Sequence, residues 1–555
     1  MKILNLCKPY LLSHKLTLSA YLALTLFATG INILSPYLIG SFLDALIAGS
    51  GINEVLRFCA IFGGLNFLRI LKNYLTTIMH TKMHVSMGYS FNRDTIRHIQ
   101  QLSLSYANQL DSAYMSNRVG TDTVSLIVFC IGIIQNIISN TVILVATIIL
   151  LFNLNPLTAA ALLSFLGIYA AVYFAFKKPL YNAGIVFAEA QSTFFSKLTE
   201  QFKCIKLIKL NAVQPEINAR SDSAFKTFKS AAVHSRKINH IYSSLDGIIS
   251  TIAQIVLFVI GGMQILAGNF TIGMFTIFTS YFGMMLTSCR YFFGLGAQLQ
   301  KAKVAYNRID EILKLKVESC GSTILSDIST IELRDLSFKH NQKDNAKSTT
   351  ISRDVINNFS AFFEKGNIYA LKGANGTGKS TLMALILGMY VDEYKGSVKY
   401  NGLDIREIDM VNLRKTLVGS TEQEPSLIED SIAYNLTFDN CLDNCDLTDI
   451  KQLNLRECIS VLNMNGFIHK NSLNFTINEK SDNTSGGEKQ KISILKVLHK
   501  NPTVMMFDEP TSALDKSTTE SFISHLQEIK KDKIIILITH DEYILNVCDK
   551  IYHID

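Results

Sequence analysis

One glycine-rich stretch decides the fold of the C-terminal half of this chain: Gly373-Ala374-Asn375-Gly376-Thr377-Gly378-Lys379-Ser380-Thr381. It has the spacing G-x-x-x-x-G-K-S, follows the apolar run 368–371 and precedes a helical pattern at 382–387. Glycines in such a turn let backbone N–H groups converge on phosphate oxygens, and the helix start adds positive charge. We therefore expect a nucleoside triphosphate here, with Lys379 on its β- and γ-phosphates and the Ser380 hydroxyl on Mg²⁺.

The composition indicates a membrane protein in two parts. At 555 residues the chain exceeds a single domain, and 48% hydrophobic residues stand beside only 18% charged ones, with a mean hydropathy of +0.22. The apolar content lies almost entirely before Gly296. The net charge of +7 comes largely from the loops of this half, so it does not indicate a nucleic-acid partner.

Long charge-free segments predict about six membrane-spanning helices. Residues 16–43 carry no charge, which is enough to cross about 30 Å of hydrocarbon, and a second apolar segment at 55–78 is interrupted by Arg69 and Lys72. Residues 123–176 are free of charge for far longer than one span and break at the polar turn 153–156. Residues 247–289 form a similar hairpin.

The loops between these spans predict the orientation. The short turns at 44–54, 153–156 and 268–271 contain no Lys or Arg, whereas the long loops 80–122 and 177–246 are rich in both. The positive-inside rule places the long loops and both termini in the cytosol. Their helical patterns predict that the membrane helices continue well beyond the bilayer, toward an ATPase domain.

Three charges fall within predicted spans: Arg69, Asp246 and Arg290. One interpretation is a cationic, inward-open cavity that receives a substrate, with Asp246 as a counter-charge. The other is that the arginines reach lipid phosphates or pair between helices. The sequence leaves both interpretations open.

After residue 315, strands alternate with helical patterns, which predicts a parallel α/β sheet. The apolar strand 503–507 ends in Asp508 and Glu509. A carboxylate at such a strand end can hold Mg²⁺, and the next can polarise an attacking water. We assign the first role to Asp508 and the second to Glu509.

Four further motifs lie around this strand: Thr484-Ser485-Gly486-Gly487-Glu488, Gln423, Asp515 and His540. With them, nearly the whole chain resembles an ABC exporter half-transporter of the type I exporter (type IV transporter) fold. The resemblance implies an all-α, six-helix transmembrane domain with long cytosolic extensions, fused to an α/β P-loop ABC ATPase domain. We expect residues 1–315 to form the first, 316–330 a linker and 331–555 the nucleotide-binding domain.

The resemblance also implies roles for individual residues. ATP would lie between residues 373–381 of one copy and Ser485–Glu488 of another, while Gln423 would contact Mg²⁺ and the attacking water. His540 would bind the γ-phosphate and orient Glu509. Residues 116–119 with Asp122 resemble the family pattern that follows the first coupling helix, and the stretch from 199–200 through 211–216 resembles the region of the second. Glu479 would face these coupling helices.

Three positions depart from the family pattern. His340 stands where a tyrosine usually stacks on adenine, Thr484 replaces a leucine, and Glu488 replaces a glutamine. A carboxylate facing phosphates would be repelled, so we predict that Glu488 turns away from them. The Glu-Lys-Gln continuation resembles that of exporters of antimicrobial or modified peptides.

We therefore expect ATP-driven export of a peptide or amphipathic natural product across the inner or plasma membrane, by a homodimer or with a paralogous half-transporter. A lipid flippase and a multidrug exporter are alternatives. An ATP-gated channel or regulator is a further one, against which Glu509 and His540 argue. Because the chain starts at the membrane lead-in, we expect a peptide cargo to be matured elsewhere. The charge-free hairpins exclude a soluble ABC ATPase that acts on nucleic acid.

Overall fold

The computed structural model describes the chain except for residues 1, 50, 108–111, 345–348, 392, 440–452, 479–482 and 555. It forms two compact units. The first consists of Met1–Arg97 and Ser112–Lys314, and the second of His98–Asp111 and Leu315–Asp555. The segment His98–Asp111, which lies between two membrane helices in the sequence, is thus part of the second unit.

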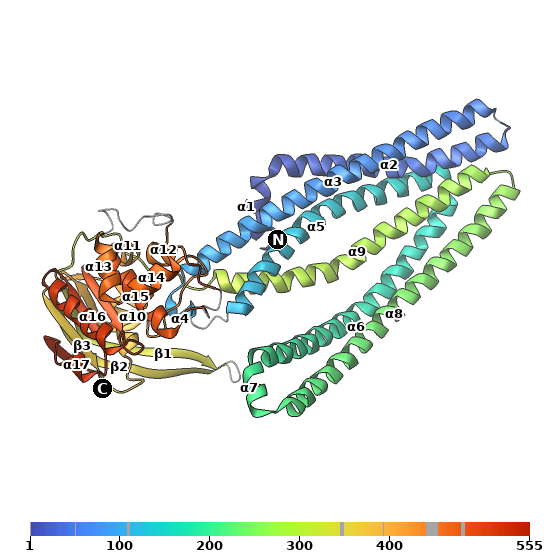
Figure 1. Cartoon of the computed structure of the whole chain (residues 1–555). Coiled ribbons are helices and arrows are strands. Elements are labelled where there is room, and N and C mark those ends of the chain that lie inside the picture. The colour runs from blue at the N-terminus through green and yellow to red at the C-terminus, as the bar shows by residue number, and fades with distance from the viewer. Residues whose placement is uncertain are drawn as a thin grey trace. The chain divides into compact units, whose positions relative to one another are not determined.

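The described part of the first unit is helical (Figure 1). Two of its long helices begin at a side chain that caps them. The Asn155 side chain accepts a hydrogen bond from the Thr158 N–H before a helix that starts with Pro156, and Thr271 caps the last long helix in the same way. The helices are α1 (Lys2–Ser13), α2 (Lys15–Ile47), α3 (Ile52–Gln100), α5 (Ser112–Leu154), α6 (Pro156–Lys203), α7 (Ile205–Asn211), α8 (Gln214–Leu266) and α9 (Ile272–Leu313).

The predicted loops 80–122 and 177–246 are mostly continuations of these helices. Helix α3 runs on to Gln100, and α8 starts as early as Gln214. Helices α6 and α8 lie side by side, and the short helix α7 joins them at one end (Figure 1). The predicted helical extensions of the transmembrane domain are therefore confirmed.

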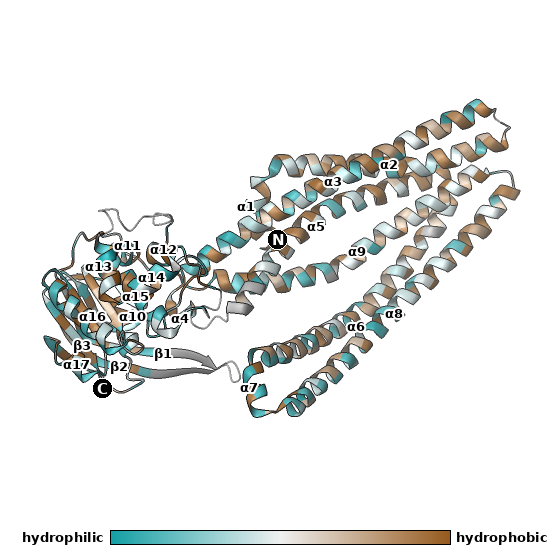
Figure 2. Ribbon diagram, in the orientation of Figure 1, coloured by the Kyte–Doolittle hydropathy of each residue, from teal (hydrophilic) through white to brown (hydrophobic). Residues whose placement is uncertain are grey.

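Five of the described helices are long and apolar enough to cross a membrane, namely α2, α5, α6, α8 and α9. The sixth predicted span lies within α3, where Arg69 and Lys72 interrupt the apolar run. Hydrophobic residues continue along the long helices (Figure 2), yet only 11–44% of the most apolar window of each of the five is buried. An apolar helix surface left this exposed fits lipid or another apolar protein surface.

Glycines let two of the membrane helices approach closely. A side chain at Gly40 of α2 would collide with Ile277 and the backbone of Gly273, and one at Gly273 of α9 would collide with Gly40. Beside this contact, the Asp44 carboxylate accepts hydrogen bonds from the Thr271 hydroxyl at 2.7 Å and the Gly273 N–H at 2.8 Å. Asp44 therefore ties the end of α2 to the start of α9.

The second unit is built on a parallel sheet with the strand order β6-β7-β8-β3-β9. The strands are β6 (Val418–Thr421), β7 (Val504–Asp508), β8 (Ile534–Ile538), β3 (Asn367–Lys372) and β9 (Lys550–His553). The predicted parallel sheet is confirmed. An antiparallel sheet accompanies it, with the order β2-β1-β4-β5, made of β2 (Thr349–Glu364), β1 (Thr330–Asp344), β4 (Tyr394–Tyr400) and β5 (Leu403–Asp404).

The central strands β7, β8 and β3 of the parallel sheet are buried on both faces, as their continuous apolar sequences require. Met506 and Ile536 belong to one hydrophobic cluster, whereas their neighbours Met505 and Ile535 belong to another. Alternate side chains thus point to opposite faces of the sheet. The remaining elements are α4 (Leu104–Ala107), α10 (Lys379–Ile386), α11 (Met410–Thr416), α12 (Ile432–Thr437), α13 (Leu453–Val461), α14 (Asn465–Asn471), α15 (Gly486–Lys500), α16 (Lys516–Ile529), the 3₁₀ helix η3 (Lys530–Asp532) and α17 (Glu542–Leu545).

Candidate functional site

The glycine-rich loop lies between the buried strand β3 and the start of α10. Gly376 and Gly378 have φ values of +85° and +95°, in the left-handed region that favours glycine. A side chain at Gly378 would also come within 2.9 Å of the Val355 carbonyl oxygen. The loop therefore turns tightly and brings its backbone to the N-terminus of a helix, where anions bind.

Lys379 is held against this loop. Its Nζ donates hydrogen bonds to the carbonyl oxygens of Gly373 and Ala374, both at 2.8 Å, and the side chain is buried. Thr377 also donates to the Ala374 carbonyl, at 3.1 Å. The ammonium group thus lies inside the turn that the sequence assigns to phosphates. Asn375 is exposed on the loop, and Thr381 follows in α10.

The Ser380 hydroxyl donates a 2.6 Å hydrogen bond to the Asp508 carboxylate. Asp508 ends β7, and both β3 and β7 pair in parallel with β8, so their carboxyl ends lie at one edge of the sheet. Hydroxyl and carboxylate oxygens are ligands that suit Mg²⁺. The two residues that the sequence assigns to the metal therefore lie together.

Charge is disfavoured on Asp508 in this environment. Burial raises the pKa of Asp508, and the negative charge of Glu509 raises it as well, while the hydrogen bond from Ser380 and the charge of Lys379 lower it. A cation bound beside the carboxylate would favour its ionised form.

Two side chains that follow other strands of the sheet lie close to the Glu509 carboxylate. Gln423, which follows β6, donates a 3.1 Å hydrogen bond from Nε2 to one carboxylate oxygen of Glu509. His540, which follows β8, places its Nε2 at 3.9 Å from the other oxygen. Glu509 itself has a φ of +45°, a conformation uncommon for residues other than glycine. Three residues that are far apart in the sequence therefore converge.

One residue at this site had no role in the sequence analysis. Gln490 of α15 is buried and donates from its Nε2 to the Glu509 backbone oxygen at 3.3 Å. It supports the backbone where Glu509 adopts its left-handed conformation. In the sequence, only its position two residues after Glu488 could have indicated a role for Gln490 at this site.

Ser485–Glu488 form the start of α15. Ser485 is the N-cap, and its hydroxyl accepts a hydrogen bond from the Glu488 N–H at 3.3 Å. The Glu488 carboxylate in turn bonds back to Ser485, which completes a capping box. Nearby, Asp515 caps α16 by accepting from the Thr518 N–H at 2.9 Å. In the described part of the chain, no hydrogen bond joins Ser485–Glu488 to the phosphate loop.

The sequence-predicted residue His340 lies in β1, where it pairs with Arg353 of β2. Its side chain is outside the described part of the structure, as is Glu479 altogether. The adenine-stacking role of His340 therefore stays a prediction.

The segment before α5 is attached to the second unit by charge-assisted hydrogen bonds. The hydroxyls of Ser103 and Ser105, at the short helix α4, both donate to Glu393 Oε1 at 2.6 Å. The Glu318 N–H also donates to the Gln101 carbonyl at 2.7 Å. These contacts hold a piece of the membrane half's sequence on the nucleotide-binding unit.

Two of the three charges in the predicted spans form an ion pair. Arg290 Nε of α9 lies 3.0 Å from the Asp246 carboxylate of α8, and Arg290 Nη2 donates to the Tyr169 hydroxyl of α6 at 3.2 Å. For Arg290 this geometry favours pairing between helices over an unpaired cationic cavity. Arg69 lies on α3 with an exposed side chain.

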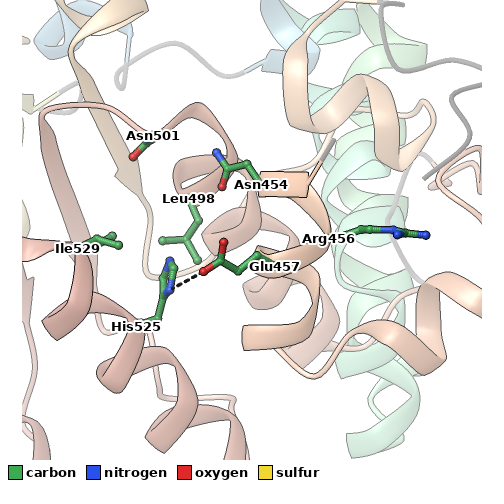
Figure 3. Close-up of a pocket in the computed structure, with 7 residues that line it drawn as sticks. All are labelled: Asn454, Arg456, Glu457, Leu498, Asn501, His525 and Ile529. Atoms are coloured by element: carbon green, nitrogen blue, oxygen red, sulfur yellow. Dashed lines mark ion pairs between the residues drawn. The ribbon is translucent and has the colours of Figure 1, made fainter. Parts of the chain in front are cut away.

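A separate pocket of about 530 Å³ lies between α13, α15 and α16 (Figure 3). On its wall, His525 Nδ1 lies 3.9 Å from a Glu457 oxygen, and the apolar side chains of Leu498 and Ile529 also line the pocket. None of the residues that the sequence assigns to the nucleotide lines this pocket.

The opposite environments of Asp508 and Asp515 predict opposite effects on stability. Because the pKa of Asp508 is raised in the folded protein, its charged form disfavours folding, increasingly so as the pH rises above the unfolded-state pKa. Asp508→Asn should therefore leave the thermal stability of the nucleotide-free protein equal to or above that of the parent. Hydrogen bonds from the Thr518 N–H and Ser517 lower the pKa of Asp515, so Asp515→Ala should lower stability.

The same Asp508→Asn variant should lose the stabilisation that Mg²⁺ and ATP give the parent, about 2.7 kcal/mol at a hundredfold excess over the dissociation constant. Thermal unfolding with and without Mg·ATP measures both effects. Loss of stability in the nucleotide-free Asp508→Asn protein, or an undiminished shift with Mg·ATP, would contradict this assignment.

The chain matches two families. Residues 18–289 match the ABC transporter transmembrane region, and residues 356–512 match the ABC transporter family. Among solved structures, a bacterial Atm1-family ABC exporter with ATP bound superposes with a TM-score of 0.83 at 17% identity, over 98% of this chain and 94% of that one. This likeness shows the fold.

Several curated proteins are similar along almost the whole chain. ABC transporter B family member 1 of Dictyostelium discoideum is 25% identical over 97% of this chain, which spans 58% of that relative's length. The lactococcin-G-processing and transport ATP-binding protein of Lactococcus lactis is 26% identical over 96% of this chain and 74% of its own length. A transport/processing ATP-binding protein of Streptococcus pneumoniae is 23% identical over 99% of this chain and 74% of its own.

The two family matches lie on the two units that the structure separates, and the exporter fold extends over both. The chain therefore belongs to the ABC transporters and is an exporter-type half-transporter, one transmembrane region fused to one ATP-hydrolysing domain.

Proposed function

We propose that this chain is a primary-active exporter that uses ATP hydrolysis to move a peptide or an amphipathic natural product across the cytoplasmic membrane. One observation carries the proposal. The phosphate loop, the Ser380–Asp508 pair and the Glu509 cluster gather at one edge of the parallel sheet. They do so in a chain whose other half has five helices suited to a membrane.

The residues of this edge suit ATP with Mg²⁺. Lys379 is poised to exchange its two carbonyl acceptors for phosphate oxygens, which bind an ammonium group more strongly. Ser380 and Asp508 would hold Mg²⁺, with the amide oxygen of Gln423 as a further ligand. When bound there, Mg²⁺ neutralises charge on the phosphates and polarises the terminal one.

Glu509 is the general base in this proposal. Its carboxylate would accept a proton from the water that attacks the γ-phosphate, while Gln423 and His540 hold the carboxylate in place. Gln490 acts as a positioning residue, because it bonds the Glu509 backbone and lies on the helix that begins at Ser485.

The site requires a second copy of the chain or a paralogous half-transporter. In the described part of the chain, Ser485–Glu488 bond to one another and make no hydrogen bond to their own phosphate loop, and in this proposal they face an ATP held by a partner. An added side chain at Gly486 would meet no atom of this chain within 4 Å. Intrachain packing therefore does not require glycine there, whereas close approach by an outside group does.

The cargo class is proposed from two of the relatives. The names of the Lactococcus and Streptococcus proteins describe processing and transport, in one case of lactococcin G. These names favour a peptide or amphipathic cargo over a lipid or an assorted set of drugs. The protein is a multi-pass membrane protein, and we infer an inner or plasma membrane with both termini and the ATPase domain in the cytosol.

Replacing the proposed base should separate ATP binding from hydrolysis. Glu509→Gln keeps the size of the side chain but cannot accept the proton, so turnover should fall by about 10²- to 10⁴-fold while ATP remains bound. Phosphate release and retention of labelled ATP by protein in lipid nanodiscs measure the two quantities. Turnover at the parental rate would show that Glu509 is not the base.

In the same nanodiscs, the parent protein should respond to one class of added solute. We expect peptides to stimulate its ATP hydrolysis more than lipids or cationic drugs do, and Glu509→Gln to abolish the stimulation. Stimulation by lipids or drugs alone would replace the peptide proposal, and failure of every class to stimulate would favour a regulator.

Removing the Glu393 acceptor should weaken the response to cargo. Glu393→Ala deletes both hydrogen bonds to Ser103 and Ser105 but lies outside the nucleotide site. Basal hydrolysis should persist, whereas peptide stimulation should fall severalfold, since each lost bond to a charged group is worth about 1.5–3 kcal/mol. Glu528→Ala, an exposed position on α16, is the matched control. Equal stimulation in both variants would exclude a coupling role for Glu393.

A further inference from the structure

We propose that Arg290 binds the C-terminal carboxylate of a peptide cargo, at one end of a polar face of α9 that lines the transport path. This inference rests on the proposed function and adds the part of the peptide that the protein recognises. Arg290 is held by Asp246 and Tyr169 but keeps hydrogen-bond donors that no described residue uses.

Between residues 276 and 294, α9 buries apolar side chains and exposes small or polar ones. The large buried side chains are those of Ile277, Phe278, Tyr281, Phe282, Met285 and Leu286. The four exposed residues are Gly283, Thr287, Arg290 and Gly294, and their spacing of three or four residues places them on one face of the helix. Thr276 and Ser280, which are partly exposed, continue this face.

Lipid does not suit such a face. Helix α8 exposes a row of large apolar side chains in its own span, namely Ile248, Ile252, Ile255 and Val259, and these fit hydrocarbon. On α9, by contrast, the Ser280 and Thr287 hydroxyls donate to carbonyl oxygens of their own helix, at 2.8 and 2.9 Å, and leave their oxygens as acceptors. Water or a polar solute can use these acceptors, whereas lipid tails cannot. We therefore place the transport path along this face.

Arg290 is the only charged residue of α9 between Ile272 and Gln300. It lies about 27 Å along the helix from Ile272, close to one edge of a hydrocarbon layer about 30 Å thick. The predicted orientation places this edge toward the cytosol. A solute that enters the path from the cytosol therefore meets the guanidinium first.

The contacts of Arg290 orient its guanidinium without using all of it. Nε lies 3.0 Å from the Asp246 carboxylate and Nη2 donates to the Tyr169 hydroxyl at 3.2 Å, while Tyr169 donates to the Asp246 backbone oxygen at 3.0 Å. Among the described residues, none accepts a hydrogen bond from Nη1. The side chain is 41% exposed, so the Nη1 donors can reach a solute.

A carboxylate is the group that these donors fit best. A guanidinium bonds a carboxylate through paired, charge-assisted N–H donors, and every unmodified linear peptide carries such a carboxylate at its C-terminus. Asp246 neutralises Arg290 when no cargo is present, and its negative charge competes with that of the cargo. Asp246 and Tyr169 are positioning residues for Arg290.

The experiment compares two N-acetylated, fluorescently labelled amphipathic peptides of one sequence, one with a free C-terminal carboxylate and one with a C-terminal amide. Fluorescence anisotropy measures their binding to the nucleotide-free, full-length protein in nanodiscs, and stimulation of ATP hydrolysis is measured on the same samples. The acid peptide should bind the parent about tenfold more tightly than the amide, the scale of a hydrogen bond to a charged group.

Arg290→Gln should remove this difference by weakening the binding of the acid peptide alone. Arg290→Lys keeps the charge without the planar fork of donors, so it should give an intermediate difference. Arg69→Gln, which removes the exposed arginine of α3, is the matched control and should keep the parental difference.

Asp246→Asn should act in the opposite direction. Asparagine keeps an oxygen that can accept from Arg290 Nε but removes the competing negative charge, so the acid peptide should bind severalfold more tightly than it binds the parent. Binding of the amide peptide should not change. Weaker binding of the acid peptide to Asp246→Asn would contradict the proposed competition.

Equal affinities of the two peptides for the parent, or a difference that survives Arg290→Gln, would overturn the role of Arg290. If the two peptides bind equally and both stimulate ATP hydrolysis, the proposed function stands and only this role falls. If neither peptide binds or stimulates, the peptide cargo and the role of Arg290 fall together.

Discussion

The parallel hydrogen-bonded ladder that joins β7, β8 and β3 is the constraint on which the nucleotide site depends. Parallel pairing aligns the carboxyl ends of these strands, so the residues that follow them meet at one edge although they are far apart in the sequence. The 2.6 Å contact between Ser380 and Asp508 spans this edge. The strand order and the burial of the sheet place Ser380 and Asp508 where they could hold a metal ion. They also bring Gln423 and His540 to Glu509.

The membrane half follows a different constraint. Its helices satisfy their own backbone hydrogen bonds and leave wide apolar surfaces uncovered, so they need lipid or a second subunit around them. One segment of the same sequence, His98–Asp111, nonetheless belongs to the nucleotide-binding unit and is bonded to it through Glu393. In the sequence, this segment lies between the long helices α3 and α5 of the first unit.

Much of this organisation could be predicted from the sequence, because the signals were local. The phosphate loop, the charge-free hairpins and the strand ending in Asp508 depend on spacing and periodicity within short windows. The pairing of Arg290 with Asp246 could not be decided, since it depends on the rotation of α8 against α9. The contacts of Gln490 and Glu393 likewise join elements whose distance is fixed only by the tertiary fold. Glu488 was predicted to turn from the phosphates, and the structure adds that it turns onto Ser485.

The most direct measurement of the central claim is ATP-driven transport in inside-out proteoliposomes that contain only this chain. A fluorescent amphipathic peptide and ATP are supplied outside, where the nucleotide-binding domains face. We predict that the peptide accumulates in the lumen against its gradient when Mg·ATP is present and does not accumulate with ADP. Hydrolysis of ATP without accumulation of any peptide, lipid or drug would contradict export by this chain and would identify it as a regulator or as one half of a heterodimer.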